Sequence, residues 1–446
     1  MARTVFEIDR SQRHLGPIWL TPGIGPVNVL VLFFSAMMTI VYVTAIGVLL
    51  PYLLTGHLGM STSQQGTFVG NLTVGIEILA LLLVLPFGAL ADKIGRVPVF
   101  VGAFTVTCIA LILLPLAATP AMLVAGRVLL GIGLAAGTLM LGTIIGDYPQ
   151  NASRGKLISI NGVITGFGVV LIASFGFAQL PKILSQRGYD TVTAGTYTFW
   201  LMAALAAVAA VVTWFGLRDG RPDKSVEKDS LFETLKKGVA ATRANPRLGI
   251  AGVAYFVSRG DLIVMTTFLT LWIVATGTDA GVPIEDAQAR GGMLFGISQL
   301  AMILFMPVMG FLVDRFDRVS VLAFSMGVAA AGYLALSQAG DPFTSPWIYA
   351  VVIAAGAGEA CILVSGPALV GQEAPGRVRG AVFGTMGFCG ALGVLIHSWM
   401  CGQLFNGVSY QTPFLYMAVL NALVGLLAVA VRLRTRHAAA QPAAAE

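Results

Sequence analysis

The chain has 446 residues, of which 57% are hydrophobic and only 11% are charged, and its formal net charge is +6. Soluble domains carry about 25% charged residues, so this composition excludes an ordinary water-soluble protein and indicates a chain that lies in a membrane. The positive charge does not indicate nucleic-acid binding, because basic loops on one side of a bilayer account for it.

Residues 1–26 have mixed polarity and are expected to form a cytoplasmic N-terminal segment. Six long apolar runs follow, and at 1.5 Å per residue each can cross a hydrocarbon core of about 30 Å. We expect them to form an N-terminal six-helix bundle over residues 27–217. The predicted spans are 27–50, 66–88, 98–117, 121–146, 156–180 and 197–217.

Residues 218–247 form the one long charged stretch of the chain. Within it Leu231, Phe232, Leu235 and Val239 recur at helical spacing. We therefore predict a cytoplasmic linker that contains a short amphipathic helix lying on the membrane surface.

Six further apolar runs follow the linker and predict a C-terminal six-helix bundle over residues 248–431, with a cytoplasmic tail at 432–446. The predicted spans are 248–276, 291–313, 319–338, 346–370, 380–403 and 411–431. The sequence thus predicts an all-α integral membrane protein with 12 transmembrane helices in two pseudo-symmetric bundles.

The loops differ strongly in positive charge. If the N-terminus is cytoplasmic, 22 of the 27 Lys and Arg residues lie on that side, and only Lys182, Arg187 and Arg290 lie on the other. Such a bias predicts that both termini are cytoplasmic. We expect a multi-pass protein of a bacterial cytoplasmic (inner) membrane.

A short polar turn between the second and third spans is repeated 222 positions later. Residues 88–100 and 310–322 share a glycine, an acid and two basic positions, although Gly95 is replaced by Asp317. The matching residues are Gly88, Leu90, Asp92, Lys93, Arg96 and Val99 with Gly310, Leu312, Asp314, Arg315, Arg318 and Val321. Together with a second repeat, 147–155 against 373–380, this predicts two homologous halves, as in many secondary transporters.

With these motifs the sequence resembles the major facilitator superfamily. Residues 88–96 match the Gly-x-Leu-x-Asp-(Arg/Lys)-x-Gly-Arg signature of that family, and residues 127–133 resemble its Arg-x-x-x-Gly-x-Gly signature. The resemblance implies two six-helix bundles around a central cavity that opens alternately to each side. It also implies a conformational latch on the cytoplasmic side. The residues carried over to the latch are Gly88, Asp92, Arg96, Arg154, Asp314 and Arg318.

Three carboxylates lie near the middle of predicted spans. A charge at the bilayer centre costs about 2.5–3.5 kcal/mol on insertion scales, so Glu77, Asp261 and Glu359 are candidates for proton coupling. Gly356 and Gly358 precede Glu359 and are expected to leave open space beside it. For each acid the alternative is a structural hydrogen bond or ion pair between helices.

Two arginines and three other side chains are candidates for substrate binding. Arg259 suits an anionic substrate or a carboxylate such as Glu359, and it is 200° around the helix from Asp261. Arg127, by the resemblance, belongs to a site tied to proton coupling. The remaining candidates are Tyr42, Tyr255 and His397, for which packing between helices is the commoner role.

The leading hypothesis is a proton-coupled secondary transporter that works by alternating access and exports small amphipathic compounds. The runner-up is proton-driven uptake of an organic anion or metabolite, with Arg259 or Arg127 as the anion site. A third class is a non-transporting membrane receptor or assembly factor on the same fold.

Several other activities lack their sequence signals. There is no phosphate-binding Gly-x-x-x-x-Gly-Lys-(Ser/Thr) loop and no HExxH motif, so we expect neither ATP hydrolysis nor another enzyme activity. The four cysteines form no Cys-x-x-Cys pair, so we expect no metal and no cofactor. The expected partners are a small-molecule substrate, protons and the lipid bilayer, with the chain working as a monomer.

Overall fold

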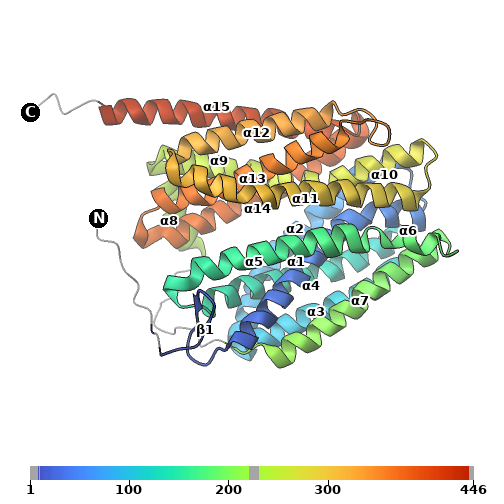
Figure 1. The fold of residues 1–446 in the computed structure, drawn as a ribbon, viewed down its shortest axis with the longest axis horizontal. Coiled ribbons are helices and arrows are strands. Elements are labelled where there is room, and N and C mark those ends of the chain that lie inside the picture. Colours follow the sequence, from blue (N-terminus) through green and yellow to red (C-terminus); the bar gives the residue numbers. More distant parts are fainter. Residues whose placement is uncertain (1–8, 10, 220–230, 441–446) are drawn as a thin grey trace, which may run out of the picture. The chain divides into compact units, whose positions relative to one another are not determined.

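The computed structural model describes residue 9, residues 11–219 and residues 231–440. This part contains 12 helical segments that are long and apolar enough to cross a membrane, which confirms the predicted fold class. The segments divide into two compact units (Figure 1). Unit 1 comprises Met1–Ser61, Gly75–Val226 and Val282–Met293, and unit 2 comprises Thr62–Val74, Glu227–Gly281 and Leu294–Glu446.

The first half of the chain forms six long helices and several short elements. The long helices are α1 (Pro26–Tyr52), α2 (Thr62–Ile94), α3 (Arg96–Leu113), α4 (Pro120–Asp147), α5 (Arg154–Gly168) and α7 (Thr191–Gly216). α1 and α5 continue as the π-helical segments η1 (Leu53–His57) and η4 (Val169–Phe177). The short elements are β1 (His14–Leu15), β2 (Ile18–Trp19), η2 (Leu114–Leu116), η3 (Asn151–Ser153) and α6 (Leu180–Ser185).

The second half begins with the linker helix α8 (Leu231–Ala244). The seventh span is built from α9 (Pro246–Ile263), the π-helical η5 (Val264–Phe268) and α10 (Leu269–Asp279). The other helices are α11 (Ile284–Arg315), α12 (Arg318–Ser337), α13 (Ile348–Glu373), η6 (Gly376–Val378), α14 (Arg379–Gly407) and α15 (Thr412–Ala440).

The linker helix α8 is present where the amphipathic pattern predicts a helix, and it packs against α14. At Gly238 an added Cβ would lie 2.3 Å from the backbone oxygen of Ala381 in α14. Such an approach is possible only for a residue without a side chain. One face of α8 is therefore held against α14 within unit 2.

The N-terminal residues are bound to the loop that joins α4 and α5. The backbone N–H of Gln150 donates to the Trp19 carbonyl, and the backbone N–H of Trp19 donates to Ser153 Oγ at 3.0 Å. The Gln150 side chain also donates to the Leu20 carbonyl at 3.0 Å. The short β1–β2 hairpin thus fixes the loop that follows Asp147.

The turn at Gly95 explains why the first copy of the repeat needs a glycine. Gly95 has φ of +101°, a conformation that disfavours any side chain. The cap of α3 comes from elsewhere in the chain, because Asp219 Oδ1 accepts the backbone N–H groups of Arg96 and Val97 at 2.7 and 2.9 Å. The guanidinium of Arg96 pairs with Asp147.

The second copy has an aspartate at the same position because it caps its own helix. Asp317 has φ of −58°, and its carboxylate accepts the backbone N–H of Ser320 at 3.0 Å. The same carboxylate pairs with Arg247, which also binds Glu373 at 2.8 Å. The sequence difference between the copies therefore reflects two ways of capping the following helix.

We expect acid to destabilise unit 2 partly through Asp317. Partial burial acts to raise the pKa of this carboxyl, but hydrogen bonds from Ser320 and the charge of Arg247 more than offset it and hold the pKa below its usual value. A lowered pKa in the folded state contributes stability above the ordinary value of about 3.9, and this contribution is lost as pH falls through the folded value.

The measurement is the melting temperature of the purified protein between pH 6 and pH 3. Asp317→Asn should lower it at pH 6 and make it less sensitive to acid than the wild type. Equal acid sensitivity in the two proteins would contradict this role of Asp317.

Candidate functional site

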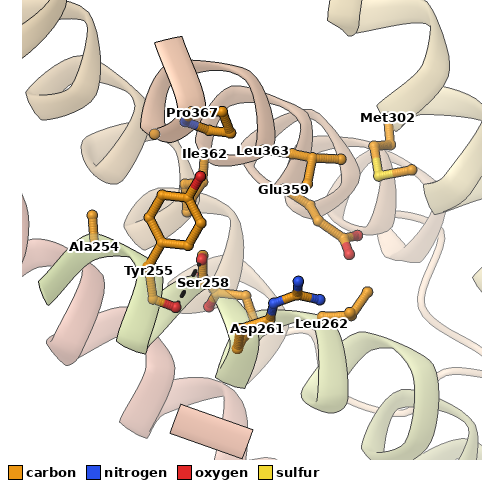
Figure 2. A pocket seen from close by; sticks show the side chains of 12 residues that line it. Ala254, Tyr255, Ser258, Asp261, Leu262, Met302, Glu359, Ile362, Leu363 and Pro367 are labelled. Atoms are coloured by element: carbon orange, nitrogen blue, oxygen red, sulfur yellow. Dashed lines mark hydrogen bonds between the residues drawn. The ribbon is translucent and has the colours of Figure 1, made fainter. Parts of the chain in front are cut away.

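A cavity of about 250 Å³ lies within unit 2, between α9, α11 and α13. It brings together four candidate residues of the seventh and tenth spans. Figure 2 shows the carboxylate of Glu359 reaching from α13 into this space, with Tyr255 of α9 beside Ile362 and Pro367. The lining consists of Ala254, Tyr255, Ser258, Arg259, Asp261, Leu262, Met302, Glu359, Ile362, Leu363, Gly366 and Pro367.

Arg259 is the basic residue of this lining. Its side chain forms no ion pair within 4.0 Å with the residues that the structure describes, although Glu359 lines the same cavity. Gly390 of α14 makes room for its stem, because an added Cβ there would lie 2.8 Å from Arg259 Cγ. The guanidinium can therefore receive an anionic group from outside the protein.

Glu359 is buried, with 6% of its surface exposed. Its Oε2 accepts a hydrogen bond from Gln299 Nε2 of α11 at 3.1 Å. An amide donor stabilises the carboxylate less than a cation does. A buried carboxylate held in this way can exchange its charge for a proton at moderate cost.

Asp261 is more enclosed than Glu359, with 1% of its surface exposed. Its Oδ1 accepts a hydrogen bond from Asn421 Nδ2 at 2.8 Å, whereas Oδ2 has no hydrogen-bond partner among the described residues. The Tyr333 hydroxyl donates to the backbone oxygen of Asp261 at 3.1 Å. A buried carboxylate with one oxygen unpaired carries a costly charge, and a proton on Oδ2 would neutralise that charge.

The glycines before Glu359 do not leave open space, so that expectation is wrong. An added Cβ at Gly356 would lie 2.1 Å from the backbone oxygen of Ser298 in α11, and one at Gly358 would lie 2.6 Å from Ala329 Cα in α12. Small residues allow helix backbones to approach closely in a membrane. Here they let α13 pack tightly on two neighbours, and this packing positions Glu359.

We therefore expect Gly356→Ala to displace α13 and to lower stability by about 1–3 kcal/mol, the usual cost of overpacking. Gly371→Ala is the matched control, since it lies on the same helix and an added Cβ there meets nothing within 4 Å. The measurement is thermal unfolding in detergent. Equal melting temperatures for the two variants would contradict the packing role of Gly356.

The candidates of unit 1 lie outside this cavity. Arg127 of α4 is 9% exposed, and its Nε has no hydrogen-bond partner among the described residues. Tyr42 of α1 donates its hydroxyl proton to the Met202 carbonyl at 3.2 Å and lines a space of only about 10 Å³. Glu77 of α2 is half-buried.

His397 is fully buried in α14 beside α9 and is not part of the cavity lining. Its Nδ1 lies 2.9 Å from the Tyr416 hydroxyl, and its ring is 4.6 Å from that of Phe256. An added Cβ at Gly260 would lie 2.4 Å from its ring. This environment is typical of a packing residue between helices.

The latch candidates lie near the ends of α2, α3, α5, α11 and α12. Arg154 donates to the Gly146 carbonyl at 3.1 Å, and Arg318 donates to the Ala368 carbonyl at 2.7 Å. Asp92 and Asp314 are exposed, and Gly88 has open space where a side chain would lie. The ion pair of Arg96 is with Asp147, which was not among the predicted latch residues.

A sequence model of the Major Facilitator Superfamily matches residues 32–396 and 287–446 of the chain. The chain belongs to this superfamily. It is therefore a multi-pass membrane protein of a family of transporters, as the signature turn predicts. The match covers the spans that build both units.

Two curated relatives are magnetosome proteins of Paramagnetospirillum magneticum strain AMB-1. The chain is 27% identical to MamH over 91% of its own length and 92% of that protein. It is 28% identical to MamZ over 85% of its own length but spans only 58% of MamZ. Among solved structures, the nucleoside transporter NupG is similar in fold, with a TM-score of 0.69, 18% identity, and coverage of 91% of this chain and 98% of NupG.

Proposed function

We propose that the protein is a secondary active transporter that moves a small amphipathic organic molecule across a bacterial cytoplasmic membrane and couples this movement to protons. The observation that carries the proposal is the cavity of unit 2, where Arg259, Asp261 and Glu359 share one lining. Ionisable side chains at membrane depth are expensive and mark pathways for substrates and ions.

The lining of the cavity favours an amphipathic substrate. Leu262, Met302, Ile362 and Leu363 supply apolar surface, whereas Arg259 supplies one cation. Binding sites of this kind take their affinity from apolar contacts and their orientation from a few polar groups. A ligand with an apolar body and a group that accepts hydrogen bonds from Arg259 fits this lining.

Glu359 is the proposed proton carrier, with Asp261 as a second site. Glu359 has an amide partner and borders the cavity, so a proton can reach it together with the substrate. A charged carboxylate in a dry site costs several kcal/mol, and taking up a proton removes that cost. Alternating access would carry the proton and the substrate in the same cycle.

The second candidate is proton-driven uptake of an organic anion. The absence of an ion pair on Arg259 among the described residues favours it, because an unpaired guanidinium at membrane depth attracts an anion. Export and anion uptake differ in the direction in which an inward proton gradient drives the substrate. A receptor or assembly factor, the third candidate, need not keep ionisable groups in a cavity.

The proposal also covers the domains of the chain, the orientation of its termini and the latch. Residues 27–217 and 248–431 are the two bundles, residues 218–247 are the linker, and both termini are cytoplasmic, as the charge of the loops favours. The turns that carry Asp92 and Arg96, and Asp314 and Arg318, act as the latch. The chain works as a monomer.

Transport by purified protein in liposomes tests the proposal. Ligands are first found by their stabilising effect on the folded protein, since a ligand that binds the folded state raises its melting temperature. Flux of those ligands is then measured with and without an imposed pH gradient. An equal flux with and without the pH gradient would refute proton coupling. Ligands that bind but are not transported would favour a receptor.

A further inference from the structure

A second groove lies within unit 2, on the outer surface where α11, α12 and α15 meet. Its volume is about 280 Å³, and it is lined by Leu312, Phe316, Ser320, Val321, Phe324 and Arg432. α12 and α15 run side by side here (Figure 1). The groove is separate from the cavity of unit 2 that Arg259 and Glu359 line, and the two share no lining residue.

The walls of this groove suit a hydrocarbon chain. Phe316 and Phe324 are each 55% exposed, whereas Val321 at its floor is only 5% exposed. Leu312 packs on a buried apolar cluster that includes Val321. These residues lie at or beside the ends of candidate membrane spans, where the headgroups of lipids meet their acyl chains.

One rim of the groove is cationic. Arg432 of α15 lies at this rim, and among the described residues the carboxylate paired with it is that of Asp317, at 4.0 Å from Nε. Both oxygens of that carboxylate have other partners, because Arg247 pairs with one and Ser320 donates a hydrogen bond to the other. Asp317 therefore neutralises Arg432 only weakly, and the guanidinium has donors left for a further anion.

We infer that this groove binds an anionic phospholipid, with its phosphate on Arg432 and an acyl chain along Phe316 and Phe324. An acyl chain matches the apolar walls, and a phosphate matches the guanidinium fork. The positive charge of Arg432 favours an anionic headgroup over a zwitterionic one. The inference does not depend on what the transporter carries.

The test compares phosphatidylglycerol with phosphatidylcholine on the purified full-length protein in detergent, with bound lipid counted by native mass spectrometry. One cation near a membrane surface adds about 1 kcal/mol to the binding of anionic lipid, so Arg432→Gln should weaken phosphatidylglycerol binding about fivefold. Arg432→Lys should keep most of the binding. Arg434→Gln, an exposed arginine two positions away, is the matched control and should bind as the wild type does.

Three results would overturn the inference. Equal weakening by Arg432→Gln and Arg434→Gln would indicate diffuse attraction to surface charge. Equal binding of the two lipids would show that the headgroup charge is not recognised. Competition by inorganic phosphate at similar concentration would indicate a site for a water-soluble anion. Transport measurements enter none of these outcomes, so the transport proposal is tested separately.

Discussion

Replacing Glu359 with glutamine should abolish accumulation driven by a proton gradient while leaving the protein folded. If one proton moves with each substrate molecule, a gradient of one pH unit supplies about 1.4 kcal/mol and supports about tenfold accumulation. Glutamine has nearly the same shape and can still bond to Gln299, but it cannot carry a proton. Accumulation should therefore fall to about onefold, whereas passive exchange of substrate persists.

Asp341→Asn is the matched control for this variant, because it makes the same chemical change in an exposed loop outside the cavity. The measurement is the ratio of internal to external substrate in proteoliposomes with an imposed gradient. Accumulation by Glu359→Gln at the level of the control would exclude Glu359 as the proton carrier.

Replacing Arg259 with glutamine should weaken substrate binding strongly. Hydrogen bonds to charged groups are worth about 1.5–3 kcal/mol, which corresponds to a loss of affinity of about 10- to 150-fold. Arg259→Lys should recover part of the affinity, because lysine keeps the charge but not the planar fork of donors. Arg187→Gln removes an exposed arginine between α6 and α7 and should leave affinity unchanged.

Affinity is measured as the ligand concentration that half-saturates the rise in melting temperature. Equal affinity in the wild type and Arg259→Gln would show that the substrate does not contact this guanidinium. Loss of melting behaviour in the variant would instead indicate a structural role for Arg259 within unit 2, and Arg259→Lys then serves as the folded comparison.

The spans could be predicted from the sequence because membrane burial imposes a signal that each segment carries by itself. A run of about 20 apolar residues identifies a spanning helix without any knowledge of its neighbours. The π-helical segments η1, η4 and η5 could not be predicted in this way, since they depend on how a helix packs. η5 begins three residues after Asp261, beside the proposed site.

The candidate site could be predicted only in part, because a sequence does not show how its helices pack. Arg259, Asp261 and Glu359 are conspicuous because each puts a charge in an apolar run. Gln299 and Asn421, which bind the two acids, are neutral and lie 60 and 160 positions away from them in the chain. Their presence in apolar runs was the available signal, but a sequence does not show which helices are neighbours.

The glycines beside Glu359 show the limit most clearly. A glycine in a span fits both an open space and a close helix contact, and only the positions of Ser298 and Ala329 decide between them. Likewise Arg96 has a charged partner in Asp147 that the repeat alone did not identify. The type of residue at each of these positions was known from the sequence, whereas the residues that it contacts could be identified only from the fold.

The central claim is that substrate and proton meet in the cavity of unit 2, and the exchange of protons on ligand binding tests it most directly. Calorimetric titration of one ligand in two buffers of different ionisation enthalpy gives the number of protons bound with it. The account predicts that the wild type exchanges about one proton per ligand, released if the protein is an exporter and taken up if it imports an anion, and that Glu359→Gln exchanges none. The same number of protons in both proteins would contradict it.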